Sequence, residues 1–494
     1  TAAGHPALDA GSAVMRVAFG TTVLARGLAQ GGVDGIGSYT RELLQRMATS
    51  PQLSLQPFAY AGPVPPGMAS GMVNAGDFQR QALLSLATGL PFGRLQKALA
   101  NKVDVLHATD HYIPRLRGIP VIATLMDAIP LAHPEWVTYR FKRAKNEAWR
   151  RSAQWAQHIL TISEHSRSEI AQWFRIPEKR ISVVPLGVDE RWFATPSSEE
   201  LTHVRQHYQL PERFFLAVGT LQPRKNIGTL IAAHRLLAPQ LRQDIPLVVV
   251  GKAGWGCEDV VAQLAHGDGG ALRWLRYVPD ADMLPLLHQA SALVFPSLHE
   301  GFGLPVLEAM SCGAAVIGAN TTSIPEVIGR EDALFDPHSP SSIAEKIVEV
   351  LENPERLATL RAHSLAQAKK FSWDISAKSA LQALEKISTS THGKKNSPQG
   401  LIDRLLPLIQ DTPENDLKRL AQAISCNIPN TKPQLLIDVS ELVQRDSRTG
   451  IQRVVRSILQ QWFQNPPSTF DLHLVYADKK YIGYRYAKKF TRLL

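Results

Sequence analysis

The chain has 494 residues, of which 44% are hydrophobic and 20% are charged, a composition that excludes a disordered or collagen-like protein and predicts several folded domains. Its net charge is +10, but residues 431–494 hold 11 Lys and Arg against 5 Asp and Glu, and no regular basic stripe with interleaved aromatic residues occurs, so we exclude nucleic acid as a partner. Three widely spaced cysteines exclude a disulfide framework and indicate a reducing compartment. The sequence contains no apolar run of about 18 residues, so we predict no membrane-spanning helix.

Residues 1–14 precede the first predicted strand and are rich in small residues. They lack the charged start and apolar core of a signal peptide, so we expect a disordered cloning remnant. Residues 15–195 then alternate short apolar runs with segments of helical pattern. This alternation predicts a Rossmann-like domain built on a parallel sheet. The expected strands are Arg16–Phe19, Val103–His107, Val121–Leu125, Ile159–Ser163 and Ile181–Pro185.

The pattern restarts near residue 214 and predicts a second α/β domain over residues 196–387. Its expected strands are Phe215–Gly219, Leu247–Gly251, Leu272–Tyr277, Ala292–Phe295 and Ala315–Ile317. Three amphipathic helices follow, in which apolar residues recur at three- and four-residue spacing. They are Ser341–Leu351, Pro354–Lys370 and Asp374–Ile387, and we expect them to close this domain. The fold class is therefore α/β, with two doubly wound halves.

A polar run over residues 388–400 predicts a linker, and an apparent helix pair extends this connecting region to residue 430. Leu435–Val439 then resembles another first strand. Asp34–Leu44 and Thr449–Leu459 each follow such a strand after a short loop, and they share Gly-Ile, an Arg and the final Leu in register. This similarity predicts an internal repeat, in which residues 431–494 begin a second, truncated unit. A chance similarity between two helix starts is the alternative.

Two adjacent cations, Arg224 and Lys225, follow the strand that ends at Gly219 and Thr220, and they stand at the start of a predicted helix. The N-terminus of a helix attracts anions through its free N–H groups and its dipole. An Arg side chain can grip two oxygens, and Lys adds a point charge. The turn therefore suits a diphosphate, with a solvated basic turn as the alternative.

Two carboxylates, Glu300 and Glu308, stand eight residues apart after the buried strand Ala292–Phe295. The turn Gly301–Gly303 between them allows a close approach of the backbone to a ligand, and Pro305 suits the first turn of a helix that carries Glu308. Glu300 could accept hydrogen bonds from sugar hydroxyls, and Glu308 could hold a ribose diol. One capping and one solvated Glu is the alternative.

These residues resemble the donor signature of the retaining glycosyltransferases of the GT-B class called family 4, in which a Glu, seven residues and a second Glu follow one another. The resemblance extends from Met15 to about Ser372. The further motifs that carry it are Gly35–Gly37, Thr161–Ser166, Val184–Asp189, Gly219–Asn226 and Asn320–Val327. It implies the GT-B fold, in which two Rossmann-like domains face a cleft.

The resemblance also implies roles for single residues. Arg224 and Lys225 would hold the donor diphosphate, Glu308 the ribose, and Glu300 the transferred sugar. The candidate catalytic residues are Lys225, Arg224, Glu300 and Asp127. The remaining donor-binding positions are Gly35, Gly37, Gly219, Thr220, Phe302, Gly303 and Leu304, with the glycine loop at Gly35–Gly37 closing on the phosphates from across the cleft.

The activity that the resemblance implies is the transfer of a hexose, with retention, from a nucleotide sugar to a saccharide or lipid-linked saccharide acceptor in surface polysaccharide synthesis. The donor motifs look most like those of members that build O-antigen with GDP-mannose or a GDP-deoxyhexose, and a UDP-sugar is the alternative. In the front-face reaction ascribed to such enzymes the leaving diphosphate helps to take the acceptor's proton, so no protein nucleophile is expected. We also predict no essential metal. We expect a cytoplasmic location, with peripheral contact to the inner face of the bacterial plasma membrane.

One position departs from the family pattern. Where related sequences place His-Asp beside the donor sugar, this chain has Met126 and Asp127. A thioether cannot transfer a proton, so the function of that histidine is absent. His107 or His111, near the end of the neighbouring strand, could compensate, although ordinary loop histidines are the alternative. A catalytically impaired donor-binding or scaffold domain is therefore the second hypothesis for the function.

Two short motifs mimic other sites. Asp280 and Asp282 form a DxD sequence, but they stand at a predicted helix start, where acidic residues are expected, so we predict no metal site there. Gly251–Gly256 follows a strand, yet its spacing is not GxGxxG and no acidic strand end follows at the required distance. We therefore expect no dinucleotide cofactor.

Overall fold

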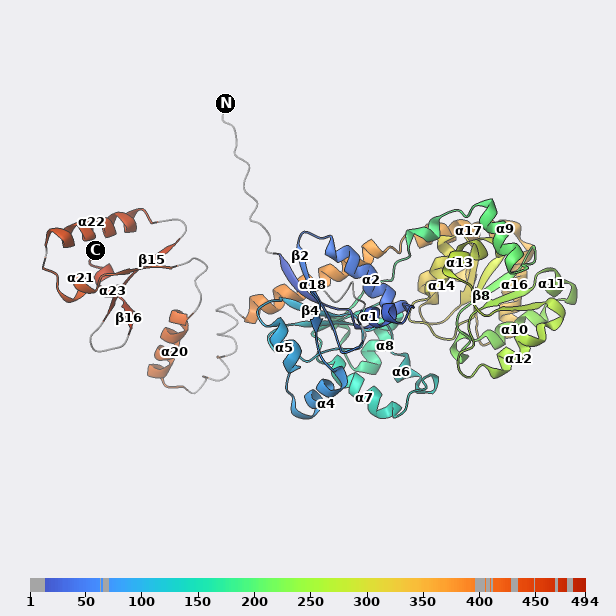
Figure 1. Cartoon of the computed structure of the whole chain (residues 1–494), viewed down its shortest axis with the longest axis horizontal. Helices are drawn as coiled ribbons and strands as arrows, with labels where there is room; N and C mark the ends of the chain where they lie inside the picture. Colours follow the sequence, from blue (N-terminus) through green and yellow to red (C-terminus); the bar gives the residue numbers. More distant parts are fainter. Residues whose placement is uncertain are drawn as a thin grey trace, which may run out of the picture. The chain divides into compact units, whose positions relative to one another are not determined.

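The structure is a computed structural model that describes residues 14–62, 64, 71–395, 405, 409, 412–427, 434–447, 449–466, 470–477 and 483–494. The chain divides into two compact units, Thr1–Gly393 and Lys394–Leu494, which we describe separately. The first unit contains two α/β domains (Figure 1). Two predicted features, the N-terminal remnant and the helix over residues 401–410, lie almost entirely outside the described residues. Within the described residues, no helix is both long and apolar enough to cross a membrane.

The first domain is built on a seven-stranded parallel sheet with strand order β3-β2-β1-β4-β5-β6-β7. Its central strands are buried on both faces, as expected when helices cover both sides of a parallel sheet. The strands are β1 Met15–Gly20, β2 Leu53–Ala59, β3 Val73–Asn74, β4 Val105–Ala108, β5 Val121–Thr124, β6 His158–Thr161 and β7 Ile181–Val183. The helices are α1 Thr22–Ala29, α2 Gly35–Ala48, α4 Phe78–Thr88, α5 Gly93–Leu99, α6 Ile129–Ala132, α7 Lys142–Ala153 and α8 Glu164–Phe174.

The second domain is built on a six-stranded parallel sheet with strand order β10-β9-β8-β11-β12-β13. The strands are β8 Phe215–Val218, β9 Leu247–Val250, β10 Leu272–Leu275, β11 Ala292–Phe295, β12 Val316–Ala319 and β13 Leu334–Phe335. The helices are α9 Ser198–His207, α10 Ile227–Leu236, α11 Pro239–Asp244, α12 Glu258–His266, α13 Asp280–Gln289, α14 Leu304–Ser311, α15 Ile324–Ile328, α16 Pro340–Glu352 and α17 Pro354–Ala368. The predicted pair of doubly wound halves is therefore confirmed.

The strand order places two crevices in this unit. In the first sheet β1 lies between β2 and β4, and in the second β8 lies between β9 and β11. The chain reverses its direction of winding at each of these positions. Ligands of open α/β sheets bind at such points, outside the carboxyl ends of the strands. A ligand-binding site is therefore expected at the loops after β4, β5, β8 and β11.

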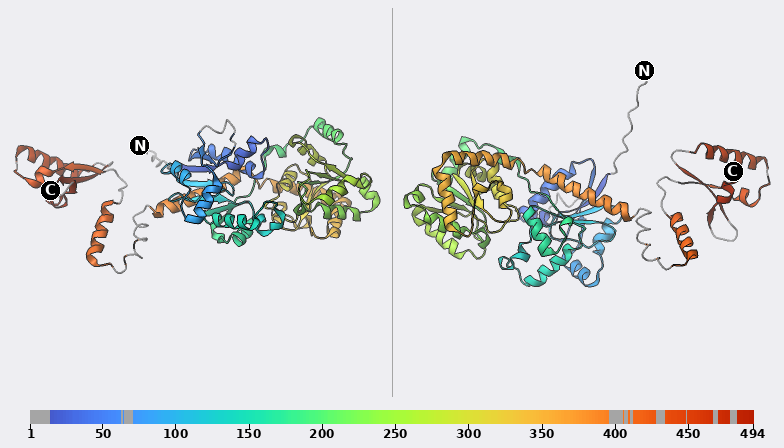
Figure 2. Two further views of the ribbon diagram at one scale, coloured as in Figure 1. Left: turned by 60° about the horizontal axis from the view of Figure 1, so that its bottom comes forward. Right: turned by 180° about the vertical axis from the view of Figure 1, so that it is seen from behind.

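Helix α18 (Trp373–Lys395) follows the second domain in the sequence but packs on the first (Figure 2). The Trp373 ring lies 6.4 Å from the Tyr39 ring, and the Asp374 carboxylate accepts a 2.6 Å hydrogen bond from Arg46 Nε. The Ser376 hydroxyl donates to the Pro185 carbonyl at 2.5 Å. We expected this segment to close the second domain and the linker to begin at residue 388. The helix instead continues to Lys395, because adding a residue to a formed helix costs far less than starting one.

The second unit contains a three-stranded sheet of order β14-β15-β16, in which β15 runs parallel to β14 and β16 antiparallel to β15. The sequence of β14, α21, α22 and β15 has the same order and the same parallel return as β1, α1, α2 and β2. The elements are α20 Glu414–Asn427, β14 Gln434–Asp438, α21 Ser440–Gln444, α22 Gly450–Gln464, β15 Asp471–Ala477, β16 Tyr484–Tyr486 and α23 Lys488–Thr491.

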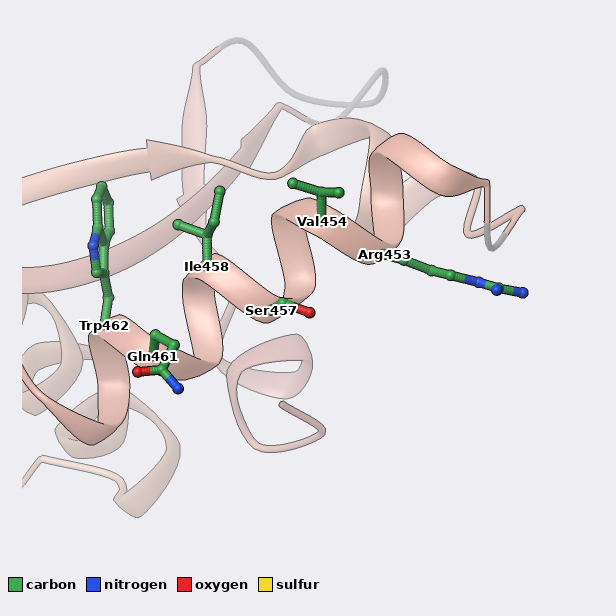
Figure 3. A pocket seen from close by; sticks show the side chains of 6 residues that line it. All are labelled: Arg453, Val454, Ser457, Ile458, Gln461 and Trp462. Carbon is green, nitrogen blue, oxygen red and sulfur yellow. The ribbon is translucent and has the colours of Figure 1, made fainter.

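Helix α22 exposes a row of apolar side chains (Figure 3). Val454, Ile458 and Trp462 lie on one face and are 59%, 46% and 41% exposed. Counted from the first residue of each helix, they correspond to three positions of α2, which are at most 2% exposed and form part of the core shared with α18. Those three residues are Tyr39, Leu43 and Met47. Within the described part of the second unit, the equivalent face of α22 is left open.

Candidate active site at the ends of β8 and β11

The two predicted cations lie in a tight 3-10 turn, Pro223–Lys225, between β8 and α10. Asn226, at the end of this turn, has a left-handed backbone with φ of 58°. Its side-chain amide donates to the carbonyls of Pro296 and Pro337 at 3.1 and 2.7 Å. The turn is thereby fixed against the loops that follow β11 and β13, and this holds both cations at the crevice.

Glu300 contacts both cations. Its carboxylate accepts a 2.5 Å hydrogen bond from Lys225 Nζ and a 2.9 Å hydrogen bond from Arg224 Nη1, which also donates to the His299 carbonyl at 3.1 Å. Lys225 and Glu300 are 9% and 7% exposed. Burial raises the pKa of Glu300, but the two cations outweigh it and hold that pKa below its ordinary value. The cluster carries two positive charges against one negative charge, so it suits an anionic ligand.

Gly219, at the end of β8, has a φ of 149°, which disfavours any residue with a side chain. A Cβ atom at this position would lie 3.4 Å from Cε of Lys225. Gly251, just after the neighbouring strand β9, comes closer still, since a Cβ at this position would lie 2.0 Å from the Gly219 carbonyl oxygen. Thr220 is exposed beside them. Gly219 therefore makes room for the Lys225 side chain, and Gly251 allows the backbones after β8 and β9 to approach each other closely.

Helix α14 begins at the same crevice. Gly303 is its N-cap residue, with φ of 111°, and no side chain caps the helix start. The Ser323 hydroxyl lies 2.9 Å from the carbonyl oxygens of Glu300 and Phe302, so it can donate to either and fix the turn that precedes the helix. The first turn, from Leu304, presents the positive end of the helix dipole to the crevice. This arrangement favours a negatively charged or hydroxyl-rich ligand.

Glu308 lies in the second turn of α14. Burial, with a smaller contribution from Asp280, raises the pKa of its carboxyl to about 7, and Arg191 acts against this change. The charged form of Glu308 is thus disfavoured in the protein alone. Hydroxyl donors from a ligand would stabilise that form.

The glycine motif Gly35–Gly37 is not a loop in the structure, since it forms the first turn of α2. The side chain of Asp34 caps this helix and accepts a 2.7 Å hydrogen bond from the Gly37 backbone N–H. A Cβ at Gly37 would lie 2.6 Å from Val33 Cγ1, whereas Gly35 has open space around it. The prediction that Gly35–Gly37 forms a loop is therefore wrong, because the preceding Asp34 caps a helix that begins at Gly35.

A cavity of about 440 Å³ opens in the first domain beside this helix start. Its wall combines aromatic rings with carboxylate, amine and amide groups. The lining residues are Ile36, Asp110, His111, Thr124, Leu125, Met126, Asp127, Pro130, Tyr139, Lys145, Asn146 and Trp149. Apolar walls with a few convergent polar groups are typical of small-molecule sites.

Met126 and Asp127 place this cavity next to the second domain. A Cβ at Gly301 would lie 3.2 Å from both Asp127 Cβ and the Met126 carbonyl oxygen. Burial raises the pKa of the Asp127 carboxyl, whose oxygen accepts a 3.0 Å hydrogen bond from the Ile129 backbone. His111 also lines the cavity.

His107 cannot replace the missing histidine. It is fully buried in β4, its Nε2 lies 2.9 Å from the Thr124 hydroxyl, and burial lowers its pKa to about 3. It also packs edge-on against the Phe19 ring at 5.3 Å. His107 is therefore a core histidine, and the hypothesis of compensation at this position is wrong.

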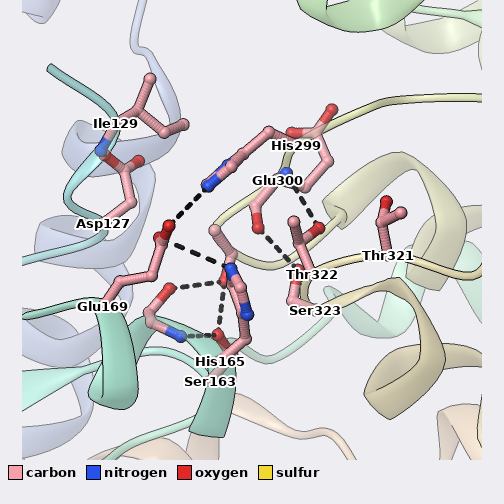
Figure 4. Close-up of polar contacts among 12 residues, drawn as sticks. Asp127, Ile129, Ser163, His165, Glu169, His299, Glu300, Thr321, Thr322 and Ser323 are labelled. Atoms are coloured by element: carbon pink, nitrogen blue, oxygen red, sulfur yellow. Dashed lines mark hydrogen bonds and ion pairs between the residues drawn. The ribbon is translucent and has the colours of Figure 1, made fainter. Parts of the chain in front are cut away.

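The N-terminus of α8 joins the two domains, a contact that sequence reasoning missed (Figure 4). Ser163 and Ser166 donate their hydroxyls to the Gly301 carbonyl at 2.7 and 3.1 Å. The Glu326 carboxylate accepts the backbone N–H groups of Glu164 and His165 at 2.8 and 2.7 Å. On the second-domain side, Gly301 lies in the loop that bears Glu300, and Glu326 lies in α15. The motifs Thr161–Ser166 and Asn320–Val327 were recognised in the sequence, but their mutual contact was not.

Asp280 and Asp282 lie in the first turn of α13, as expected of acidic residues at a helix start. They bind different partners, since Asp280 pairs with Arg191 at 3.1 Å and Asp282 accepts from the Tyr208 hydroxyl at 2.7 Å. In the other short motif, Gly251–Gly256, the first glycine follows β9 and allows the close approach to Gly219 described above.

The comparisons with known proteins assign the class. Residues 33–192 match the family model described as Glycosyltransferase Family 4, and residues 200–367 match that of Glycosyl transferases group 1. The chain is 35% identical over 358 residues to the O-antigen chain mannosyltransferase B of Escherichia coli, and the match covers 69% of this chain and 93% of the relative. The chain therefore belongs to the family 4 glycosyltransferases of the GT-B class.

A second relative is longer. The serotype-specific mannosyltransferase WbdA of Escherichia coli is 35% identical over 344 residues, which cover 68% of this chain. The match spans only 41% of the WbdA length.

Solved structures agree in fold. Sucrose-phosphate synthase from Thermosynechococcus elongatus matches with a TM-score of 0.58 and 16% identity, over 76% of this chain and all of that protein. Anabaena HepE in complex with UDP matches with a TM-score of 0.57 and 17% identity, over 75% of this chain and all of HepE. Both matches cover about the length of the first unit.

Proposed function

We propose that the first unit transfers a mannosyl residue, or a related deoxyhexose, from a GDP-linked donor to a saccharide acceptor of O-antigen or another surface polysaccharide, with retention of configuration. The similarity to two Escherichia coli mannosyltransferases supports the sugar. The observation that carries the proposal is the cationic cluster of Arg224, Lys225 and Glu300 at the crevice of the second sheet.

The cluster suggests how the donor binds. An incoming diphosphate offers Arg224 and Lys225 better-charged partners than a single carboxylate. It would therefore release Glu300 toward the sugar hydroxyls at the start of α14. Glu308 lies one turn further along the helix and would accept hydrogen bonds from the ribose diol. The loop that bears Glu300 would thus exchange an internal ion pair for contacts with the donor.

The chemical step then rests on charge. As the bond from the anomeric carbon to the phosphate oxygen breaks, negative charge grows on the leaving diphosphate, and Lys225 and Arg224 lie where they would stabilise it. Removal of one such group typically lowers the rate about 10²–10³-fold. The departing phosphate oxygen takes the proton of the acceptor hydroxyl as that hydroxyl attacks from the same face. We propose that the step needs no metal and no protein nucleophile.

The cavity beside Met126 and Asp127 supports an acceptor site. Aromatic rings such as Trp149 and Tyr139 suit the apolar face of a sugar, and Asp110 and Lys145 suit its hydroxyls or an attached phosphate. Asp127, which neighbours Gly301 in the donor loop, would lie between acceptor and donor. A saccharide or lipid-linked saccharide is therefore the proposed acceptor, and a lipid-linked one would bring the protein to the inner face of the plasma membrane from the cytoplasm.

Titration calorimetry with GDP, UDP, GDP-mannose and UDP-glucose, with and without magnesium, tests this proposal. We expect the GDP compounds to bind without magnesium and Lys225→Ala to lose this binding. Lys252→Ala is the matched control, because Lys252 lies two residues after neighbouring β9 and its Nζ lies 4.9 Å from the centre of the Tyr277 ring, outside the cluster. Preferential binding of the UDP compounds would show that the donor carries uracil and not guanine. The absence of binding by the unaltered protein would refute a donor site.

The second hypothesis is a donor-binding or scaffold module without turnover, and Met126 supports it. Radiolabelled sugar transfer by the unaltered chain and by Met126→His distinguishes the two. A module would bind GDP-mannose yet transfer nothing in either form.

The second unit supports a further assignment. Its order of β14, α21, α22 and β15 repeats that of the first domain, and Thr449 caps α22 as Asp34 caps α2. We propose that residues 431–494 are the beginning of a second glycosyltransferase unit of the same family.

A further inference from the structure

Two histidines and a glutamate gather at the junction of the two domains (Figure 4). His165 and Glu169 lie one turn apart on α8, and His299 comes from the loop before α14. Glu169 Oε1 lies 2.8 Å from His299 Nε2, and Glu169 Oε2 lies 3.5 Å from His165 Nε2. One ligand atom from each of the three side chains lies within 4.8 Å of the other two.

The proposed transfer reaction does not use this cluster. The Glu300 side chain binds Lys225, while its neighbour His299 extends to the other domain and Glu169. His299 is only 3% exposed. His165 Nε2 and Glu169 Oε2 are buried, and neither has a hydrogen-bond partner in the structure. At 3.5 Å the two atoms form an ion pair only if the imidazole is protonated, and without a common partner neither has a hydrogen bond, which is costly for buried polar atoms.

We propose that His165, Glu169 and His299 form a binding site for a divalent transition metal of the zinc class, which joins the two domains. Two imidazoles and one carboxylate are a ligand set that Zn²⁺ accepts, with bonds of about 2.0–2.2 Å and a fourth position for water. Tetrahedral bonds of this length place ligand atoms about 3.3 Å apart. The contacts of Glu169 Oε1 with His299 at 2.8 Å and of Glu169 Oε2 with His165 at 3.5 Å lie on either side of that value.

The surroundings hold the ligands in place. The His165 backbone is bound by Glu326, and the His299 carbonyl is bound by Arg224. The rings of His133 and Trp136 pack at 5.2 and 6.0 Å from the His299 ring and cover its side. Burial raises the pKa of Glu169, but the neighbouring imidazoles outweigh it and lower that pKa to about 2, so the carboxylate is ready to bind a cation. Such supporting contacts are typical of metal sites.

A metal at this position would tie α8 of the first domain to the loop that bears Glu300 in the second. Domain opening, which enzymes of this architecture need to release products, would then require a metal–ligand bond to break. We therefore expect the metal to stabilise the first unit and to slow turnover. It would take no part in the transfer itself, so metal binding can be measured whether or not the proposed function is correct.

The test is calorimetric titration of Zn²⁺ into the whole chain after treatment with a chelator, together with absorption spectra of the Co²⁺ form. We expect stoichiometric binding of one ion per chain and the intense visible bands of four-coordinate Co²⁺. His299→Gln and Glu169→Gln should each weaken binding by more than about tenfold. His266→Gln should leave binding unchanged, because His266 also pairs with a carboxylate, Asp268 at 3.1 Å, but no third ligand lies beside them among the residues that the structure describes.

The Co²⁺ spectrum of the unaltered protein keeps the proposal testable should a variant fail to fold. A spectrum of six-coordinate Co²⁺, as in water, would overturn the proposal. Equal Zn²⁺ affinity in the unaltered chain and in both folded variants would also overturn it. A rise in melting temperature with Zn²⁺ that His299→Gln abolishes and His266→Gln retains would support the bridge between the domains.

Discussion

Glu308 offers a test in which stability and ligand binding change in opposite directions. Its carboxyl has a pKa of about 7 in the folded protein against 4.5 for an unperturbed Glu. An acid with a raised folded-state pKa binds more protons when folded, so its ionisation destabilises the fold as the pH rises from 4.5 to about 7. Below 4.5 both states are protonated, and above 7 the cost is constant.

Glu308→Gln removes this cost while keeping the side-chain shape. The difference between 4.5 and about 7, at about 1.4 kcal/mol for each pH unit, gives an upper limit of about 3 kcal/mol at pH 8. At pH 5.5 the free-energy cost that the substitution removes is only about 1 kcal/mol. We therefore expect the variant to unfold at higher urea than the unaltered chain, and the gain to be larger at pH 8.

Tryptophan fluorescence in urea at both pH values measures this gain, with the exposed Glu352 on α16 substituted by Gln as the control. Equal gains at pH 5.5 and pH 8, or a loss at pH 8, would refute the reasoning. In the same preparation the variant should bind GDP more weakly, because an amide accepts fewer hydrogen bonds from a ribose diol than a carboxylate does.

Three further changes follow from the structure. Met126→His should raise the rate of sugar transfer about tenfold or more if the unit is an enzyme, as measured with radiolabelled donor. Trp373→Ala should destabilise the first unit by about 3–5 kcal/mol, measured by thermal unfolding, since the ring is 5% exposed against Tyr39. Gly251→Ala should abolish GDP binding or folding, because its Cβ would lie 2.0 Å from the Gly219 carbonyl, whereas Gly93→Ala, with open space around it, should bind GDP unchanged in calorimetry.

The strands that the sequence predicted best are those buried on both faces. Ala292–Phe295 was predicted at its observed bounds, and all ten strands predicted in the first unit exist, as does β14 in the second. In the first unit three described strands were missed: β2 and the two-residue β3 and β13. In the second unit β15 and β16 were missed. Strand β2 is half-buried and contains Pro57, and short edge strands carry too few residues for any periodicity. The parallel order was predictable, whereas the edges were not.

Local motifs also predicted part of the site. Arg224, Lys225 and Glu300 were named from two motifs 75 residues apart, and the structure brings their charges into contact. The direct pairing of Glu300 with both cations was not predicted, since spacing alone does not show which partner a carboxylate has in the absence of a ligand. The His299 contact with Glu169 was missed for a related reason: neither residue belongs to a recognised spacing within its own domain.

The position of α18 has a consequence for the order in which the chain folds during synthesis. Its residues from Trp373 onward complete the core beside Tyr39, yet they are made after the whole second domain. The first domain therefore leaves the ribosome with one side of α2 uncovered, and it keeps that surface exposed while about 180 further residues are made, which at about 5–20 residues per second takes roughly 10–40 seconds. A chaperone that shields apolar helix faces would find its binding site on nascent chains of this protein and lose it when α18 docks.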